Sequence, residues 1–528
     1  MPIAETPESR AAGLGVTGRA VALGLGVALF TQGWSIVSAR VIRSSRVDAG
    51  FLSPSLFVAM LLVICVLNPL IKSIWRGRGL AARELLTAFA MGLVGGAPIG
   101  SLFSFVTIPY YLATPENQWG KLLHPYLPSW IAPLDTDGAV TLLFNGIPEG
   151  GQIPWGAWVV PMFWWILLFA VLAFAAASLS VVLRRQWAEH ERLRYPVLEP
   201  MLAMTADGDA PWIWPGFARG RLFWIGFAIA FLFIFWNALP WVFPALPELP
   251  VQGRVTSFFG RDLPPMYTYI DPFTFAFSYF ANLDILFSVW FFFGVFVTEF
   301  GTFNRLGYSV GGRGDRYGSY DAASSWQSLG AFCVFVVFGL WMARRHLKDV
   351  ILKAWRRDHP VDDSNELLPY RFAVVGILLG YSFAIVWLVR AGMDLKMAVP
   401  LVSMLLVLYI GVARIISESG LLYIRGPMTA QSFSIYLLGA KAVSPSSLTA
   451  LLFSYPMHAN STSQMAHIAK LSEPIGGRGR RLFWAVGLAF ILATCMWAVW
   501  VLYLGYTRGA ENFGHGFICG GVHNFPDT

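Results

Sequence analysis

Charged side chains are scarce in this sequence of 528 residues. Asp, Glu, Lys and Arg together make up 13% of it, whereas soluble proteins carry about a quarter. Hydrophobic residues make up 56%, and apolar runs of about 20 residues recur, each long enough to cross a bilayer as a helix. A soluble all-helical protein would need polar faces at the helical period, which most of these runs lack. The sequence therefore predicts a polytopic membrane protein.

Cysteine pairs and the common nucleotide- and metal-binding motifs are also missing. The four cysteines, Cys65, Cys333, Cys495 and Cys519, have no paired spacing, so we expect neither a disulfide framework nor a CxxC site. The HExxH and Walker motifs are absent, no GxGxxG follows a predicted strand, and "AEHER" at 188–192 has the wrong residue order for a zinc site. We expect no metal and no other cofactor. Any transport would run on an ion gradient rather than on ATP hydrolysed by this chain.

The formal net charge of +8 does not indicate a nucleic-acid partner. Lys and Arg concentrate in short loops between apolar runs, as is typical of loops kept on the cytoplasmic side of a membrane. Four such loops are 71–84, 183–194, 343–359 and 469–483. The segment 112–155 has one basic residue, Lys121, and we expect it outside. This topology puts the N-terminus in the cytoplasm but leaves the basic loop 40–50 outside, in conflict with the rule.

Several apolar runs are strong candidates for membrane spans, and two further regions are ambiguous. The strong runs lie near 19–39, 53–75, 84–110, 156–183, 221–243, 325–343, 370–391, 397–424 and 481–505. The regions 270–300 and 428–468 contain polar interruptions, so each predicts a span, a re-entrant hairpin or two half-helices. We expect an all-α polytopic bundle of about 12 membrane segments (roughly 10 to 13) with re-entrant or broken helices.

The chain divides into one membrane domain with short polar ends. Residues 1–18 are polar or small, so we expect a cytoplasmic N-terminal segment without a cleavable signal, followed by a first span that acts as signal anchor. Residues 19–505 form the expected transmembrane domain, and residues 506–528 form a tail. Its main loops are expected at 112–155 outside the cytoplasm, and at 184–220 and 344–369 inside it. No hydrophilic stretch is long enough for a separate catalytic domain, and we expect no enzyme.

The stretch "ARIISESGLLYIRGP" places charges at the end of an apolar run. Arg414 and Glu418 are four residues apart, so they share a helix face and could pair. A charge inside a bilayer is normally paired or faces a wet cavity. Two interpretations stay open: a structural pair or interfacial anchor, and a site that includes Ser417 and lines a substrate cavity. Gly420 is positioned to end the helix just after the pair.

A second polar interruption is "NLDILFSVW", where Asn282 and Asp284 stand within a long apolar stretch. A carboxylate and an amide at a helix break supply oxygen ligands for a cation or a proton, and half-helix ends often face substrates in transporters. The alternative is a loop that surfaces at the membrane interface, where both residue types are ordinary.

Glycine and proline interrupt the run 84–110. Gly96 and Gly100 form a GxxxG pattern, which allows close helix packing. Pro98 between them cannot donate a backbone hydrogen bond and should kink or break the helix. Such a break is tolerated in mid-membrane only where protein or a cavity satisfies the freed carbonyls. Packing alone is the alternative explanation for the glycines.

The stretch "SYPMHANSTSQMAHIAK" at 454–470 is rich in hydrogen-bonding groups. Tyr455, His458, Asn460, Gln464 and His467 all lie within it. Their density suits a polar substrate such as a peptide or a metal chelate, and it also suits a plain cytoplasmic loop. The two histidines are nine residues apart, which implies no metal spacing.

Four stretches carry a family resemblance: "ATPENQWGKLLHPYLPSW" (113–130), "IPWGAWVVPMFWW" (153–165), "LRRQWAEHERLRYPVLEP" (183–200) and "ARIISESGLLYIRGP" (413–427). Here the sequence resembles an uncharacterised family of bacterial multi-pass proteins of similar length. That family shares Arg-Arg-Gln-Trp, then Glu-Arg-Leu and Tyr-Pro or Phe-Pro. In architecture it is similar to the oligopeptide-transporter superfamily, which moves peptides and metal chelates with protons. The resemblance implies a transporter and fixes no residue.

The leading hypothesis is a secondary-active, proton-coupled transporter of a small polar solute in a bacterial cytoplasmic (inner) membrane. Asp284 or Glu418 would carry the proton, and Arg414 would hold Glu418 or a substrate carboxylate. Orienting hydrogen bonds would come from Asn282 and from polar groups that include Tyr455 and Asn460.

Two other classes of function stay open at this point. One is a non-transporting membrane scaffold or assembly subunit, with the Trp- and Pro-rich loop 112–155 as its partner surface. The other is a membrane-embedded enzyme acting on a lipid-linked substrate, which would need a clustered acid, base or metal set that the sequence does not display. The expected partners are the lipid bilayer and a small polar solute, with a homo-oligomer or a membrane-complex partner left open.

Overall fold

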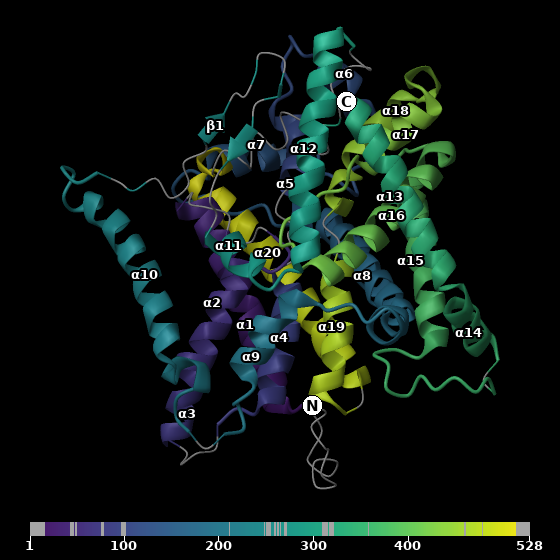
Figure 1. Cartoon of the computed structure of the whole chain (residues 1–528). Coiled ribbons are helices and arrows are strands. Elements are labelled where there is room, and N and C mark those ends of the chain that lie inside the picture. Colours follow the sequence, from purple (N-terminus) through teal and green to yellow (C-terminus); the bar gives the residue numbers. More distant parts are fainter. Residues whose placement is uncertain are drawn as a thin grey trace.

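The computed structural model of the chain is almost entirely helical (Figure 1). It describes residues 16–42, 47, 50–74, 79–96, 102–210, 212–247, 249, 255–257, 260, 263–264, 266–268, 272–308, 315, 322–356, 358–458, 461–477 and 479–513. One antiparallel ribbon is formed by β1 (Val255–Ser257) and β2 (Met266–Thr268), with Thr256 opposite Tyr267. The predicted all-α class is confirmed apart from this ribbon.

Nine helices in the described residues are long and apolar enough to cross a bilayer. They are α1 (Gly18–Ile36), the continuous run of α2 (Pro54–Leu62) and α3 (Asn68–Ile74), α8 (Gly156–Arg185), α10 (Arg221–Ala238), α12 (Leu283–Leu306), α13 (Ala322–Met342), α15 (Tyr370–Arg390), α16 (Leu395–Ser419) and α20 (Gly479–Arg508). Every predicted strong run except 84–110 coincides with one of them. The chain is therefore a polytopic membrane protein.

The other helices are shorter. They are α4 (Ala82–Gly95), α5 (Leu102–Tyr111), α6 (Trp119–Leu122), α7 (Ala139–Asn145), α9 (Glu199–Thr205), α11 (Pro272–Ser278), α14 (Arg344–Trp355), α17 (Ala430–Leu438), α18 (Pro445–Leu452) and α19 (Thr462–Ile475). The predicted run 84–110 is divided between α4 and α5, and the ambiguous region 428–468 falls on α17, α18 and α19. The other ambiguous region, 270–300, contains α11 and most of α12, which begins directly after Asn282.

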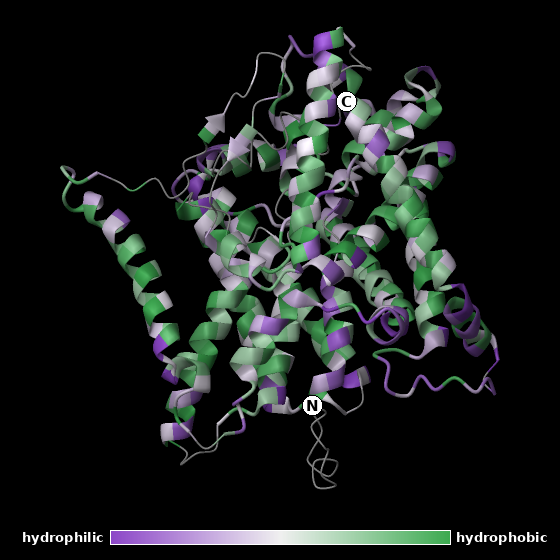
Figure 2. Ribbon diagram, viewed as in Figure 1, coloured by the Kyte–Doolittle hydropathy of each residue, from purple (hydrophilic) through white to green (hydrophobic). Residues whose placement is uncertain are grey.

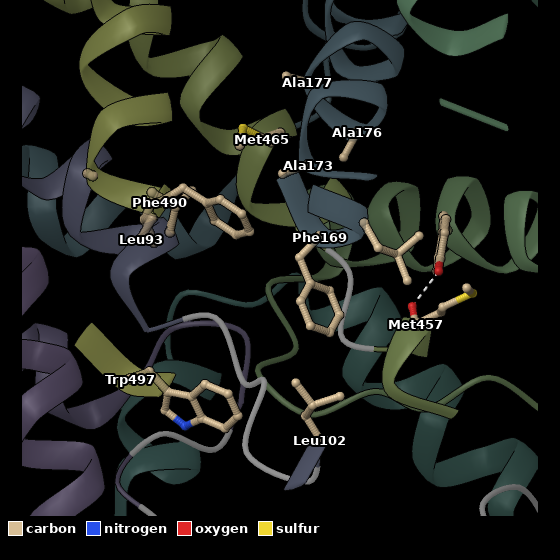
Figure 3. Packing of buried hydrophobic residues seen from close by; sticks show 14 of the residues in the cluster. Leu93, Leu102, Phe169, Ala173, Ala176, Ala177, Met457, Met465, Phe490 and Trp497 are labelled. Atoms are coloured by element: carbon tan, nitrogen blue, oxygen red, sulfur yellow. Dashed lines mark hydrogen bonds between the residues drawn. The ribbon is translucent and has the colours of Figure 1, made fainter. Parts of the chain in front are cut away.

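Small residues let α1 and α4 pack closely. A Cβ on Gly95 would lie 2.7 Å from the Cα of Ala28, and one on Gly24 would lie 2.3 Å from the sulfur of Met91. Helix contacts inside a membrane depend on such close approach, because lipid tails provide no hydrophobic drive for association. The interior next to this pair is a continuous apolar core to which α4, α8, α19 and α20 all contribute (Figure 3).

The long helix α20 runs from one end of the molecule to the other. A Cβ on Gly479, at its start, would lie 2.9 Å from the carbonyl oxygen of Glu366, and Tyr506, near its end, accepts a main-chain hydrogen bond from Ile147 at 2.8 Å. Its 30 residues are about 45 Å long. The segments 344–369 and 112–155 therefore lie at opposite ends. Which end faces the cytoplasm stays a prediction.

Two candidate spans expose most of their apolar surface. None of the residues of α10 is buried, and in α12 only Gly301 is buried. Figure 1 shows α10 standing apart from the other helices, and Figure 2 shows hydrophobic residues along its length. Exposed apolar surface of this extent is typical of a protein surrounded by lipid.

Candidate functional site

The break between α4 and α5 lies inside the molecule. Helix α4 ends at Gly95 and α5 begins at Leu102. Phe103, in the first turn of α5, stacks on Trp497 with ring centroids 5.0 Å apart. Trp497 belongs to the middle third of α20, so the break is far from either end of that helix. Pro98 lies outside the described residues, but the break predicted around it is confirmed.

A second interior helix end is that of α16. Gly420 follows its last residue with a left-handed φ of 72°, and a Cβ there would lie 2.7 Å from the Cβ of Pro196. Only glycine meets both conditions without strain. The chain then passes through α17 and α18, and the Tyr409 hydroxyl of α16 donates to the carbonyl of Met457 on the return path.

Helix α19 corrects one interpretation of the sequence. The stretch 454–470 is not a plain loop, because Thr462 to Ala469 are all buried within a helix that packs on α4, α8 and α16. Its polar side chains face protein rather than solvent. Ser180 of α8, for example, donates to the main-chain oxygen of Thr462 at 3.3 Å.

The start of α2 reaches the same region. Ser53 caps this helix, and its Oγ is 3.0 Å from the position that a Cβ on Gly96 would take. The adjacent Phe51 donates its N–H to the carbonyl of Leu422 at 2.7 Å, just beyond the end of α16. We call the meeting place of segments 51–53, 95–96, 417–422 and 462–467 the central junction.

His467 is the most enclosed titratable residue of the central junction. It has no exposed surface, and its ring packs on Phe51 at 4.7 Å and edge-on to Tyr195 at 5.1 Å. Its Nδ1 lies 2.8 Å from the Ser463 carbonyl, so in the neutral ring Nδ1 carries the proton and Nε2 is left as an acceptor. Within the described residues, Nε2 has no hydrogen-bond partner.

Other buried polar atoms around His467 are equally unsatisfied. Gln464, one turn earlier on α19, has no partner for its carbonyl oxygen among the described residues. Tyr195 donates its main-chain N–H to Ser417 at 2.9 Å; their side-chain hydroxyls are adjacent, but neither meets hydrogen-bond geometry within the described chain. Unpaired buried polar groups cost about 1–3 kcal/mol each. A cluster of them is a natural place for a polar ligand or for water.

The structure places several predicted site residues at or beside the junction. Ser417 is fully buried in the last turn of α16. Tyr455 stacks on Phe105 of α5, with centroids 5.4 Å apart and planes 2° apart. Asn460 lies outside the described residues, and Glu418 is exposed.

Arg414 does not pair with Glu418, and this expectation was wrong. Arg414 Nη2 instead lies 2.7 Å from a carboxylate oxygen of Glu191, and its guanidinium lies over the Phe335 ring at 5.1 Å. A turn of π-helix (Gln186–His190) extends α8 toward α16. The side-chain amide of Gln186 donates a hydrogen bond to the other carboxylate oxygen of Glu191 at 2.9 Å. This prearranged carboxylate is the one that Arg414 contacts.

Asn282 and Asp284 have a local role at the start of α12. The Asn282 side chain accepts the Asp284 N–H at 3.2 Å and so caps the helix. Asp284 is exposed. Within the described chain, no hydrogen bond, ion pair or ring contact joins either residue to the central junction. Their proposed part in ion or solute binding stays a prediction.

Sequence reasoning missed a buried ion network at the end of α8. Arg184 contacts Glu366 at 2.6 Å, Glu473 at 2.8 Å and Glu189 at 2.9 Å, and Glu366 is only 1% exposed. The network ties α8 to the segment before α15 and to α19. The Arg-Arg-Gln-Trp motif was the available signal, but its carboxylate partners lie up to 289 residues away.

The described residues contain no group of three or more His, Cys, Asp or Glu side chains that could hold a metal ion. Among curated proteins, none matches the chain. Its residues 10–525 match the sequence profile of a family described as a family of unknown function, DUF6785. Because that match covers nearly the whole chain, this polytopic membrane protein belongs to the DUF6785 family.

Proposed function

We propose that the chain is a secondary-active, proton-coupled transporter of a small polar solute, and that the solute binds at the central junction. The observation that carries this proposal is the meeting of interrupted helices around buried polar atoms that have no partner among the described residues. Helices α2 and α19 start in this region, while α4 and α16 end there.

Interrupted helices leave main-chain polar groups without intrahelical hydrogen bonds, and a transporter can use these groups to bind its solute. Each helix end exposes main-chain N–H or C=O groups, and inside a bilayer these groups need protein or a water-lined cavity as partner. In many secondary transporters, the ends of discontinuous helices supply contacts to the solute and the coupling ion near the membrane midplane. The central junction has discontinuous helices of this kind, since α4 and α16 end there and α2 and α19 start there.

Particular side chains have roles in this proposal. His467 Nε2 accepts a proton or a solute N–H, because Nδ1 faces the Ser463 carbonyl and Nε2 is left as an acceptor without a partner among the described residues. Gln464, Ser417 and Tyr195 orient the solute by hydrogen bonds. Glu418, next to Ser417, remains a candidate proton carrier at the exposed edge, as does Asp284 at the start of α12.

The resemblance that the sequence suggests to the oligopeptide-transporter superfamily favours a peptide-like solute or a metal chelate. Such solutes carry amide and carboxylate groups, which match the acceptors and hydroxyls around His467. The reaction is movement of the solute without a covalent step, so the protein would not be an enzyme.

The first experiment is thermal stabilisation of the purified protein by dipeptides, tripeptides, metal chelates, amino acids and sugars. A ligand that binds the folded state raises its stability by mass action. We expect one class to stabilise the wild type, and His467→Gln or Ser417→Ala to weaken binding about fivefold, since one buried hydrogen bond contributes roughly 1 kcal/mol. His190→Gln, an exposed histidine, is the matched control.

Uptake into proteoliposomes with an imposed pH gradient then tests the coupling. We expect at least one of three variants to bind solute without responding to the gradient. The variants are Glu418→Gln, Asp284→Asn and His467→Gln. Unchanged coupling in all three would remove these role assignments. A panel without any stabilising ligand would count against a solute site at the junction.

The second candidate function is a non-transporting scaffold, and the exposure of α10 favours it. A candidate span with no buried residue has a whole surface available to a partner helix. Co-purification of a stoichiometric partner, together with a silent ligand panel, would support this alternative over transport.

A further inference from the structure

A groove opens between the end of α13 and α14, away from the central junction. Its volume is about 520 Å³. Val337, Leu340 and Trp341 line it from α13, and Arg344 and Lys348 line it from α14. The wall from the candidate span is therefore apolar, while the wall from α14 combines Leu347, Ile351 and Leu352 with the two positive charges.

The groove stands where a membrane meets water. Helix α13 is long and apolar enough to cross a bilayer and ends at Met342. Helix α14 follows after one residue and is amphipathic, with Val350 buried and Arg344, Lys348, Ile351 and Trp355 exposed. Amphipathic helices with basic residues on the polar face lie along the membrane interface.

The two cationic side chains are placed for an anion. The Arg344 guanidinium lies over the Trp341 ring at 4.9 Å, and one of its nitrogens donates to the Trp341 carbonyl at 2.9 Å. These contacts hold the Arg344 guanidinium in place, and its other N–H donors lie at the edge of the groove. Lys348 is exposed, one helical turn further on, and no ion pair joins it to another described residue.

We infer that this groove binds one anionic phospholipid. The phosphate of the headgroup accepts hydrogen bonds from Arg344 and Lys348, and an acyl chain lies along Val337 and Leu340. Basic pockets beside spans on the cytoplasmic side bind anionic headgroups in this way. Helix α14 belongs to the densest basic loop of the sequence, which the charge rule assigns to that side. A zwitterionic lipid would gain the apolar contacts but no net charge attraction.

The test titrates the purified full-length protein in detergent with dioctanoylphosphatidylglycerol. Dioctanoylphosphatidylcholine, with the same chains, is the control lipid, and the melting temperature is the readout. The variants are Arg344→Gln with Lys348→Gln, Lys348→Gln alone, and Val337→Trp, which fills the apolar part without changing charge. Arg345→Gln is the matched control, because Arg345 is on the same helix and exposed but does not line the groove.

We expect the wild type to half-saturate at a lower concentration of the anionic lipid than of the control lipid. Each basic residue near the surface contributes about 1 kcal/mol, so Lys348→Gln should raise the half-saturating concentration about fivefold and the double variant roughly 30-fold. Val337→Trp should weaken both lipids, and Arg345→Gln should stay within about twofold. Equal response to both lipids in the wild type would overturn the proposal, as would equal loss in Arg345→Gln and Lys348→Gln.

Discussion

Arg414 Nη2 lies 2.7 Å from a carboxylate oxygen of Glu191, a residue on the extension of α8. The side chains are 19% and 18% exposed, so water screens the pair only in part. The contact joins α16, which ends at the central junction, to the segment that precedes Tyr195. This ion pair, which lies outside the central junction, therefore fixes the end of α16 relative to the segment that contains Tyr195.

Removing one partner of this pair should destabilise the protein. Arg414→Gln leaves Glu191 without its cation, and we expect a loss of about 2 kcal/mol, between the values for exposed and for buried pairs. The measurement is the free energy of unfolding in detergent. Glu418→Gln, on the same helix but exposed, should change it by less than about 0.5 kcal/mol. Equal losses in both variants would contradict the assigned pairing.

Arg184 should be more sensitive than Arg414, because its main partner Glu366 is almost fully buried. Arg184→Gln strands that carboxylate and should cost about 3–5 kcal/mol. The control is Arg194→Gln, an exposed arginine ten residues further along the chain, for which we expect less than about 0.5 kcal/mol. Unfolding titrations of the two variants under identical detergent conditions would measure this difference in stability. A mild effect of Arg184→Gln would mean that water reaches the network.

Gly420 should tolerate no side chain. Its φ is 72°, and a Cβ would lie 2.7 Å from the Cβ of Pro196, so Gly420→Ala combines left-handed strain with a steric clash. Strain costs about 1–2 kcal/mol and overpacking about 1–3 kcal/mol. Gly307 has a φ of 72° and a ψ of 16°, close to the ψ of 11° at Gly420, and nothing lies within 4 Å of its would-be Cβ. Gly307→Ala should therefore show the strain alone, and the difference in melting temperature between the variants isolates the clash.

Stability should fall as the pH drops below the ordinary range of histidine, in part through His346 of α14. Burial lowers the pKa of His346, helped by the nearby His190 and Arg185, while the Val182 carbonyl and Glu366 act in the opposite direction. The unfolded chain therefore binds more protons than the folded one below about pH 6.5. The stability that the buried neutral His346 contributes is fully present above that pH, and it is lost as the pH falls through the lowered pKa.

Melting temperatures of the wild type and of His346→Gln between pH 8 and pH 5 check this expectation. Glutamine can still donate to the Val182 carbonyl, which the His346 Nε2 faces at 2.8 Å. The variant should lose less stability on acidification than the wild type. Parallel curves would show that His346 does not contribute to the pH dependence.

The sequence alone determined the class of the protein and the places where helices break. Long apolar runs with few charges leave a bilayer as their only suitable environment, and the nine candidate spans agree with this. Pro98 between Gly96 and Gly100 predicted the break between α4 and α5, and Gly420 predicted the end of α16. These features are local, since they depend on hydrophobicity over one run or on the backbone freedom of one residue.

Only the tertiary structure decided which polar residues meet. Helix spacing suggested Glu418 for Arg414, but the structure supplies Glu191 from the segment that follows α8 and its π-helical turn. The polar stretch around His467 could have been a loop, and it became a buried helix because α4, α8 and α16 surround it. A polar segment can be buried only when distant parts of the chain provide its packing and its hydrogen bonds, and those distant partners are not written in its own local pattern.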